Sequence, residues 1–483
     1  MRVVLALIGV AVTGCSTTAP TIQLVVDGPF GDPDAIADGL DDLTLAIAHE
    51  GDAADLVSQS AAPGRAIDLA GVPFADDLVV HLTGRIGGDD VAYGRTCSFA
   101  FTAAGTVDDP HLFFARNVKF ASVASTTFAR RGGQAITYHD GSGVLLGGVG
   151  ADGMPVRAVE RFDPRTGATS NFTTIEARTG AVTALLGLGP SSRIAVIGGN
   201  VAGTGAAFLE LVEADAARGQ AVDRIDDAAG AMAREGLTAT ALTDGRVVVI
   251  GGAAPGGLPS GTLALITSVA GAVEIKTLRA VLAVPRVGHT ATRLGDGVGA
   301  PVLIAGGLDG TGQPIAVAEL FHPLSSDLAV PTTFAPHMVV PRSGHLARLM
   351  PDGSVLIIGG IDATGAPVRT LERFSLDTGF VAVVGALPAT AGVIGASATT
   401  LPDGRILLVG GTIPPATTAV DVAFIARLDV TDGSVDVVAT DRLAVPRTNH
   451  QAMSLCDGTV LVSGGTDTSD LVERYNPPAL GRR

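Results

Sequence analysis

The stretch Asp352-Gly353-Ser354-Val355-Leu356-Ile357-Ile358-Gly359-Gly360 contains the unit that decides the fold of this chain. Its four apolar residues, Val355 to Ile358, are bounded by turn residues, a pattern typical of a strand buried on both faces. The Asp-Gly in front predicts a tight hairpin turn, because both central residues of such a turn need positive φ. The Gly-Gly behind lets the chain leave the strand with positive φ or pass close to another backbone.

The same unit recurs along the chain. Seven Gly-Gly pairs each end a short apolar run, and the intervals between successive pairs are 51, 53, 55, 53, 51 and 54 residues. A nearly fixed period of about 50 residues indicates one small unit that is repeated and stacked. The pairs occupy residues 147–148, 198–199, 251–252, 306–307, 359–360, 410–411 and 464–465.

Each unit is expected to form four strands. A third strand follows the glycines, as in Leu371-Glu372-Arg373-Phe374, and a turn such as Asp377-Thr378-Gly379 leads into a fourth. The last unit ends after its third strand at Pro477-Pro478, which would leave an unpaired sheet edge. We expect the stretch from Arg116 to Ala121, just before the first unit, to supply that fourth strand and close a ring of seven units.

These features resemble the kelch family of β-propellers over roughly residues 115–478. The resemblance rests on the Gly-Gly pairs and on the Pro-Arg-x-x-His sequences at 285–289, 341–345 and 446–450. It implies an all-β fold with a seven-bladed kelch-type propeller over 113–478 and a short tail over 479–483. The family often has Tyr and Trp at set positions after the glycines, whereas this chain has no Trp.

The segment 22–112 lacks this period and is expected to form a separate small domain. Strand-like stretches separated by Gly, Pro and Asp predict a β-sandwich that is immunoglobulin-like in outline, without the Cys–Trp–Cys pattern. An alternative for part of it is a helix over Asp34 to Leu45. The strand-like stretches are Ile22 to Asp27, Leu43 to Ala48, Ala66 to Leu69, Leu78 to Leu82 and Cys97 to Thr102.

The N-terminus has the pattern of an export signal. A charged start and an apolar run from Val3 to Val12 precede Val12-Thr13-Gly14-Cys15, which resembles the lipobox of bacterial lipoproteins. The resemblance implies cleavage of a signal peptide over 1–14, acylation of Cys15, a tether over 15–21, and lipid anchoring outside the cytoplasm of a Gram-negative bacterium. Ser16 resembles the sorting signal for the outer membrane. An ordinary signal peptide with an incidental cysteine is the alternative.

The net charge limits the classes of binding partner, and two of the cysteines could form a disulfide. The net charge is −16 with only two lysines, which argues against nucleic acid and anionic lipid head groups as partners. Cys97 and Cys456 could form a disulfide in an oxidising compartment. They lie in different predicted domains, and the sequence does not give their separation.

Arginine and glutamate recur together in the repeat. The co-occurrence favours an Arg–Glu pair within each unit, since a buried carboxylate needs a partner and arginine offers two donors. The alternative is a ring of arginines near the central channel that contacts an anion or another ligand, with Arg234, which lacks a glutamate, the most free to bind. The arginines are Arg131, Arg178, Arg234, Arg286, Arg342 and Arg447; the glutamates are Glu160, Glu210, Glu319, Glu372 and Glu473; Ala264 and Ala426 take the glutamate position in the third and sixth units.

The sequence names no catalytic residue, no metal ligand and no cofactor. His289, His345 and His450 share one repeat position, which favours a structural hydrogen bond over a metal site. No Ser–His–Asp motif, metal-spaced cluster or phosphate loop is visible. Among kelch enzymes, copper oxidases of the galactose oxidase kind need two tyrosines, two histidines and a cysteine cross-linked to a tyrosine. The few tyrosines here (Tyr93, Tyr138 and Tyr475) and the cysteines do not match that set.

The expected function is a membrane-anchored binding scaffold in the cell envelope, most simply for a protein partner. Rigid repeats that present unlike loops are typical of recognition surfaces. The alternatives are a periplasmic carbohydrate-active enzyme, epimerase-like, that uses the propeller channel, and a purely structural role in the envelope. The loops that follow the glycine pairs are 149–155, 200–206, 253–261, 308–314, 361–367 and 412–418.

Overall fold

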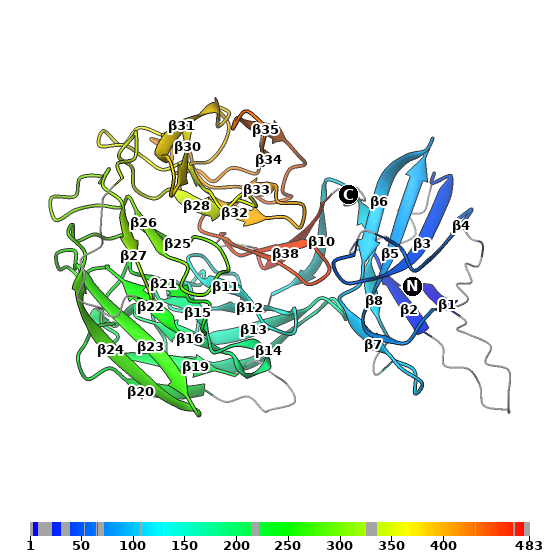
Figure 1. Ribbon diagram of the computed structural model, residues 1–483, viewed down its shortest axis with the longest axis horizontal. Helices are drawn as coiled ribbons and strands as arrows, with labels where there is room; N and C mark the ends of the chain where they lie inside the picture. Colours follow the sequence, from blue (N-terminus) through cyan, green and yellow to red (C-terminus); the bar gives the residue numbers. More distant parts are fainter. Residues whose placement is uncertain are drawn as a thin grey trace.

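The computed structural model describes residues 3–7, 22–29, 39–52, 54–63, 65, 72–106, 109–126, 128–213, 222–324, 336–429, 431–466 and 469–477. These residues form an all-β protein, with one short 3-10 turn at Gly189–Ser191. The search for a helix able to span a membrane found no candidate in this part of the chain. Figure 1 shows two bodies, a large set of small sheets and a separate N-terminal unit in blue.

The repeat region folds into small antiparallel sheets, each of three or four strands in chain order except the last. We number them from one to seven. The first sheet contains β11 (Gln134–Thr137), β12 (Gly143–Leu146), β13 (Ala158–Asp163) and β14 (Ala168–Thr174); the second β15 (Val182–Leu186), β16 (Arg193–Ile197), β19 (Phe208–Val212) and β20 (Val222–Asp226); the third β21 (Thr238–Ala241), β22 (Val247–Ile250), β23 (Thr262–Val269) and β24 (Ala272–Val281); the fourth β25 (Thr290–Arg293), β26 (Val302–Ala305) and β27 (Glu319–Phe321); the fifth β28 (Leu346–Leu349), β29 (Val355–Ile358), β30 (Thr370–Ser375) and β31 (Gly379–Ala386); the sixth β32 (Ser397–Thr400), β33 (Ile406–Val409), β34 (Ala423–Leu428) and β35 (Val435–Ala439); the seventh β36 (Gln451–Ser454), β37 (Val460–Ser463), β38 (Leu471–Asn476) and β10 (Lys119–Ser125).

The short apolar runs form the second strand of each sheet, and nearly all of their residues are buried. The first strand of each sheet contacts the first strand of the next, from β11 through β15, β21, β25, β28 and β32 to β36, and β36 contacts β11 again. The backbone repeats this closure, because Gly465 N donates to Arg130 O at 2.7 Å. The contacts between sheets therefore form a closed circuit.

The last sheet is completed by a strand from the beginning of the repeat region. β10 pairs antiparallel with β38, from Lys119 opposite Asn476 to Ser125 opposite Leu471. The expectation that a segment before the first unit pairs with the last third strand is confirmed, although the strand begins later than Arg116. Ala115–Arg116 instead forms β9, which pairs with β6 (Asp89–Arg95) of the N-terminal unit. We call the β10–β38 pairing the closing seam.

The N-terminal unit contains two sheets with a shared core. One has the strand order β4-β3-β5-β6-β9, with β7 also paired to β5, and the other has the order β1-β2-β8. Leu24, Leu45, Val80, Leu82 and Leu112 lie in one buried cluster that joins them. The remaining bounds are β1 (Val3–Leu7), β2 (Ile22–Asp27), β3 (Asp42–His49), β4 (Val57–Ala61), β5 (Ala75–Ile86), β7 (Phe99–Phe101) and β8 (His111–Phe113), and a two-stranded hairpin of β17 (Asn200–Val201) and β18 (Thr204–Gly205) lies in a loop of the second sheet.

The helical alternative at 34–45 is wrong where it can be compared with the structure. Asp42–His49 is strand β3, because this segment pairs with β4 on one side and β5 on the other and buries Leu45 and Ile47 completely. The strands expected at Ile22 to Asp27, Leu43 to Ala48 and Leu78 to Leu82 are present within β2, β3 and β5. The stretch Ala66 to Leu69 lies outside the described residues.

The cysteine pairing that the sequence left open is present. Cys97, just after β6, forms a disulfide with Cys456, in the turn between β36 and β37, and their Cα atoms are 5.0 Å apart. Cys15 lies outside the described residues.

The glycine pairs are required by both conformation and space. All fourteen glycines have φ between +60° and +92°, a region that L-residues with a side chain seldom occupy. A Cβ atom on Gly252 would lie 2.8 Å from the carbonyl oxygen of Glu235. The second glycine also links neighbouring sheets, as when Gly252 N donates to Arg286 O at 2.9 Å. The pairs therefore serve as joints between sheets.

Candidate functional site

The repeated arginines and glutamates form buried ion pairs within their own sheets. Arg286 Nη2 donates to Glu319 Oε1 at 2.7 Å, and Arg447 Nη2 donates to Glu473 Oε2 at 2.9 Å. The same contact joins three further pairs. None of the ten side chains is more than 8% exposed. The three further pairs are Arg130–Glu160, Arg178–Glu210 and Arg342–Glu372.

The arginine of the first sheet is Arg130, and the assignment of Arg131 to this position is wrong. Arg130 is fully buried, whereas Arg131 is exposed and its backbone bridges to Val149. The distinguishing signal in the sequence is spacing, because Arg130 lies 17 residues before the first glycine of its pair, as Arg234, Arg342 and Arg447 do. A glycine also stands two residues after Arg130, at Gly132. This glycine has positive φ in every arginine-bearing unit except the last, where Asn449 takes the same conformation with φ +51°.

Arg234 has no glutamate, yet its guanidinium is occupied. It is 5% exposed and donates to the carbonyl oxygens of Ala231, Gly251 and Thr262, with Nε to Ala231 O at 2.8 Å. Burial lowers the pKa of Arg234 to about 10, so the side chain stays charged at neutral pH. The expectation that Arg234 is the arginine most free to bind a ligand is therefore wrong.

Each pair ties three segments of its sheet together. The glutamate accepts backbone N–H groups of the segment that enters the sheet, as when Glu372 accepts from Val339 N at 2.7 Å and Val340 N at 3.0 Å. The arginine donates to the carbonyl of the first glycine, as in Arg342 Nη1 to Gly359 O at 3.1 Å. Because these buried arginines and glutamates use their hydrogen bonds to hold backbone groups in place, their role is structural.

The sixth sheet replaces the pair with apolar residues. Val393 and Ala426 occupy the two positions and are 2% and 1% exposed. Both lie in the apolar cluster that joins the fifth and sixth sheets. Removing both charges avoids the cost of burying either one alone, which explains why the two residues are absent together.

The three repeated histidines each bond a hydroxyl group of the preceding sheet. His289 Nε2 lies 3.0 Å from Thr238 Oγ1, His345 Nε2 lies 2.9 Å from Thr290 Oγ1, and His450 Nε2 lies 2.7 Å from Ser397 Oγ. Burial, aided by the neighbouring arginine, lowers the pKa of each imidazole to about 3. They are neutral structural links, as the sequence favoured.

The loops after the glycine pairs include turns whose backbones are fixed by hydrogen bonds within the loop. The loop at 308–314 is closed by a bridge between Leu308 and Pro314, and Asp309 Oδ1 accepts from Thr311 N at 2.7 Å and Gln313 N at 3.0 Å. Large apolar side chains stand at the tips of two loops, since Met154 is 63% exposed and Leu258 is 75% exposed. These loops therefore combine fixed backbones with unlike side chains.

Comparison with known proteins supports the fold alone. No family model matches the chain, and no curated protein matches its sequence. Among solved structures it is similar to a novel fungal alcohol oxidase of the AA5 family in complex with copper, with 15% identity over 74% of this chain and 76% of that chain and a TM-score of 0.54. It also matches YjhT, with 15% identity over 64% of this chain and 97% of that chain and a TM-score of 0.42.

The chain has a β-propeller-like fold. The alcohol oxidase was solved in complex with copper, but the tyrosines and cysteines of this chain do not fit a copper site of that kind. Tyr138 donates to Glu213 Oε1 at 2.6 Å, Tyr475 bonds Thr440, and Tyr93 lies in the N-terminal unit beside His81. Among the residues that the structure describes, no three His, Cys, Asp or Glu side chains group to hold a metal ion.

Breaking one buried pair should cost far more stability than breaking an exposed one. We expect Glu319→Ala to lower the free energy of unfolding by about 3–5 kcal/mol, because Arg286 would remain buried without its anion. The control is Asp421→Ala, whose partner Arg442 is 66% exposed and whose loss should cost less than about 1 kcal/mol. Urea unfolding of both variants measures the difference, and equal losses would contradict a structural role for the pair.

The neutral histidines should make stability fall in acid. Their folded pKa of about 3 lies below the unfolded value of 6.5, so the unfolded chain binds more protons between these limits. The contribution of these histidines to the free energy of unfolding is therefore fully present above pH 6.5. It falls by about 1.4 kcal/mol per pH unit per histidine as the pH drops toward 3.

His345→Gln should reduce the pH dependence of the unfolding free energy between pH 6.5 and 4, and the control His322→Gln, at an exposed position, should not. Urea unfolding at four or more pH values gives the slope for each variant. Parallel curves for wild type and His345→Gln would show that this imidazole is not held neutral by the fold.

Proposed function

We propose that the chain is a seven-bladed kelch-type β-propeller behind a small immunoglobulin-like β-sandwich, and that it acts as a binding scaffold for a protein partner in the cell envelope. The seven sheets would be the blades, with the closed circuit of first-strand contacts as the ring. The observation that carries the functional proposal is the state of the buried arginines, all of which are bonded within the fold.

An enzyme that used the ring interior would need a convergent set of polar groups not already paired with each other. The arginines and glutamates are instead closed into pairs inside single sheets, and the histidines bond hydroxyl groups of neighbouring sheets. This arrangement favours binding or structure over an epimerase-like activity. No specific observation favours the enzyme.

The loops after the glycine pairs are the proposed contact surface. Met154 and Leu258 leave apolar area exposed at two loop tips, where burial against a partner would be favourable. The loop carboxylate of Asp309 is already bonded within its own turn, so it shapes the loop. Apolar tips beside such shaped loops suit a folded protein partner better than a charged polymer.

Attachment to the outer membrane through Cys15 is part of the proposal and rests on the resemblance of 12–15 to a lipobox. The disulfide between Cys97 and Cys456 supports an oxidising compartment outside the cytoplasm. Several acyl chains on one cysteine would anchor the chain stably.

Charged loop tips should abolish partner binding. Met154→Asp combined with Leu258→Asp is expected to lose a saturable protein partner that the native chain captures from envelope extracts, because charge at an apolar contact must be desolvated. The matched control is Leu376→Asp, which is 60% exposed but lies in the turn between β30 and β31. Quantitative mass spectrometry of the captured proteins reads out the result. Capture unaffected by the loop variant, or lost equally in the control, would contradict the proposed surface.

Removal of the anchor should release the chain from the membrane. Cys15→Ser is expected to shift the protein from the membrane fraction to the soluble extracytoplasmic fraction, since the acyl chains can no longer be attached. Fractionation followed by detection of the chain measures this. Equal membrane association of Cys15→Ser and the native chain would contradict lipid anchoring.

A further inference from the structure

The N-terminal unit contacts the repeat region at the closing seam. Asn476, the last residue of β38, is 1% exposed and lies opposite Lys119 of β10. Its Nδ2 atom donates to Tyr93 O and Ala115 O, both at 2.8 Å, and both acceptors belong to the N-terminal unit. Val118 N also donates to Asn476 O at 2.8 Å. One buried amide therefore joins the end of the last strand to β6 and β9.

A second contact lies two residues earlier in β38. Arg474 pairs with Asp457, donates from Nε to Thr459 Oγ1 at 2.7 Å, and lies over the ring of Phe113 of the N-terminal unit at 4.3 Å. Both charged side chains are 2% exposed. The equivalent pair of the fifth sheet, Arg373 with Asp352, is 29% and 21% exposed. The N-terminal unit therefore covers in the seventh sheet a pair that another sheet leaves open to solvent.

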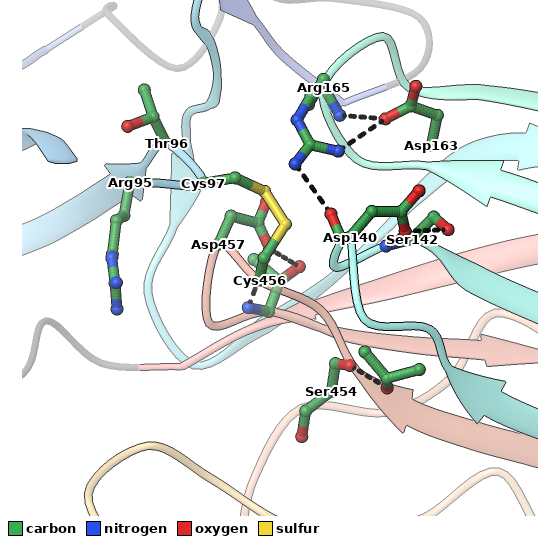
Figure 2. Close-up of a disulfide and its surroundings, with 12 residues drawn as sticks. Arg95, Thr96, Cys97, Asp140, Ser142, Asp163, Arg165, Ser454, Cys456 and Asp457 are labelled. Carbon is green, nitrogen blue, oxygen red and sulfur yellow. Dashed lines mark hydrogen bonds and ion pairs between the residues drawn. A yellow bond between two sulfur atoms is a disulfide. The ribbon is translucent and has the colours of Figure 1, made fainter. Parts of the chain in front are cut away.

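The third contact is covalent. Figure 2 shows the disulfide that joins Cys97 to Cys456, with Asp140 and Ser142 of the first sheet beside it. A Cβ atom on Gly141 would collide with the sulfur of Cys456, so the turn of the first sheet packs directly against the bond. The disulfide thus lies where the first sheet, the seventh sheet and the N-terminal unit meet.

The closing strand itself also emerges from the N-terminal unit. β9 ends at Arg116, and only Asn117 and Val118 separate it from β10, which starts at Lys119. The unit therefore holds one side of the seam through the chain and the other side through Asn476, Arg474 and Cys456. The two strands of the seam are joined to each other by backbone pairing and by side-chain packing such as that of Phe120 on Tyr475, whose ring centroids are 4.9 Å apart, which are noncovalent contacts.

We propose that the N-terminal unit acts as a clasp, by which we mean a domain that holds the two strands of the closing seam together. We propose further that the Cys97–Cys456 disulfide makes this clasp sensitive to reduction. A dithiol reductant would open it in a two-electron exchange. One thiolate attacks a sulfur of the bond and forms a mixed disulfide, and the second thiolate displaces the protein sulfur. The products are two cysteine thiols on this chain and the oxidised dithiol. The seam would then be held by noncovalent contacts only.

Hydrogen exchange on the full chain tests the clasp. We expect reduction with dithiothreitol to raise backbone exchange about tenfold or more in peptides that cover 119–125 and 471–476, because local opening of the seam is no longer opposed by the cross-link. Peptides that cover 247–250 and 355–358, in the third and fifth sheets, should be unchanged. Alkylation of the released thiols, read by mass, shows that the bond was reduced.

Two variants keep the test decisive if the bond resists reduction. Cys97→Ser with Cys456→Ser should show the reduced pattern without reductant and should not respond to dithiothreitol. Asn476→Ala, in the oxidised chain, should give a smaller increase confined to the same two peptides. Unchanged exchange at the seam in the cysteine variant would overturn the proposal. An equal increase in all four peptides would also overturn it, since the disulfide would then stabilise the whole fold and not the seam.

Discussion

Burying a guanidinium is costly unless it is paired and hydrogen-bonded, and six arginines occupy one repeated, buried position in the repeat region. Five arginines bind a glutamate of their own sheet, and Arg234 binds carbonyl oxygens instead. Because an arginine and its glutamate also bond the glycine pair and the entering segment, as in the fifth sheet, they fix three parts of such a sheet at once. The glycine pairs then carry the connection to the next sheet, as from Gly252 to Arg286.

This constraint also limits where function can reside. Charged side chains that recur in the interior are used by the fold, and the histidines are held neutral by burial. What differs between units is displayed on loops whose backbones are fixed by their own turns. The N-terminal unit is attached to the repeat region in a different way. It covers Arg474 of the seventh sheet and is joined to that sheet by a disulfide.

Much of the repeat region could be predicted from the sequence because its signals are local. An apolar run between Asp-Gly and Gly-Gly defines a buried strand and both of its turns, so strands such as Val355–Ile358 are found as expected. The Arg–Glu pairing was also readable, since the two residues occur together in five units and are both absent from the sixth, with the third unit, which has Arg234 alone, as the exception. The choice between Arg130 and Arg131 was missed because both are arginine and each has a glycine two residues later, so that the spacing of 17 residues to the glycine pair is what separates them. The strand at 42–49 was ambiguous because its apolar residues suit either a buried strand or a helix until its neighbours are known.

The sequence by itself therefore determined the repeat, its strands and most of the Arg–Glu pairs, because these depend on neighbours within one unit of about 50 residues. Only the tertiary structure decided which distant segments meet. Cys97 and Cys456 are 359 residues apart, and the two strands of the closing seam lie at opposite ends of the repeat region. Arg234 likewise acquires its partners from backbone carbonyls, which every residue carries and no pattern marks. Such contacts depend on how the sheets are arranged in space, and that arrangement cannot be inferred from a pattern of neighbouring residues.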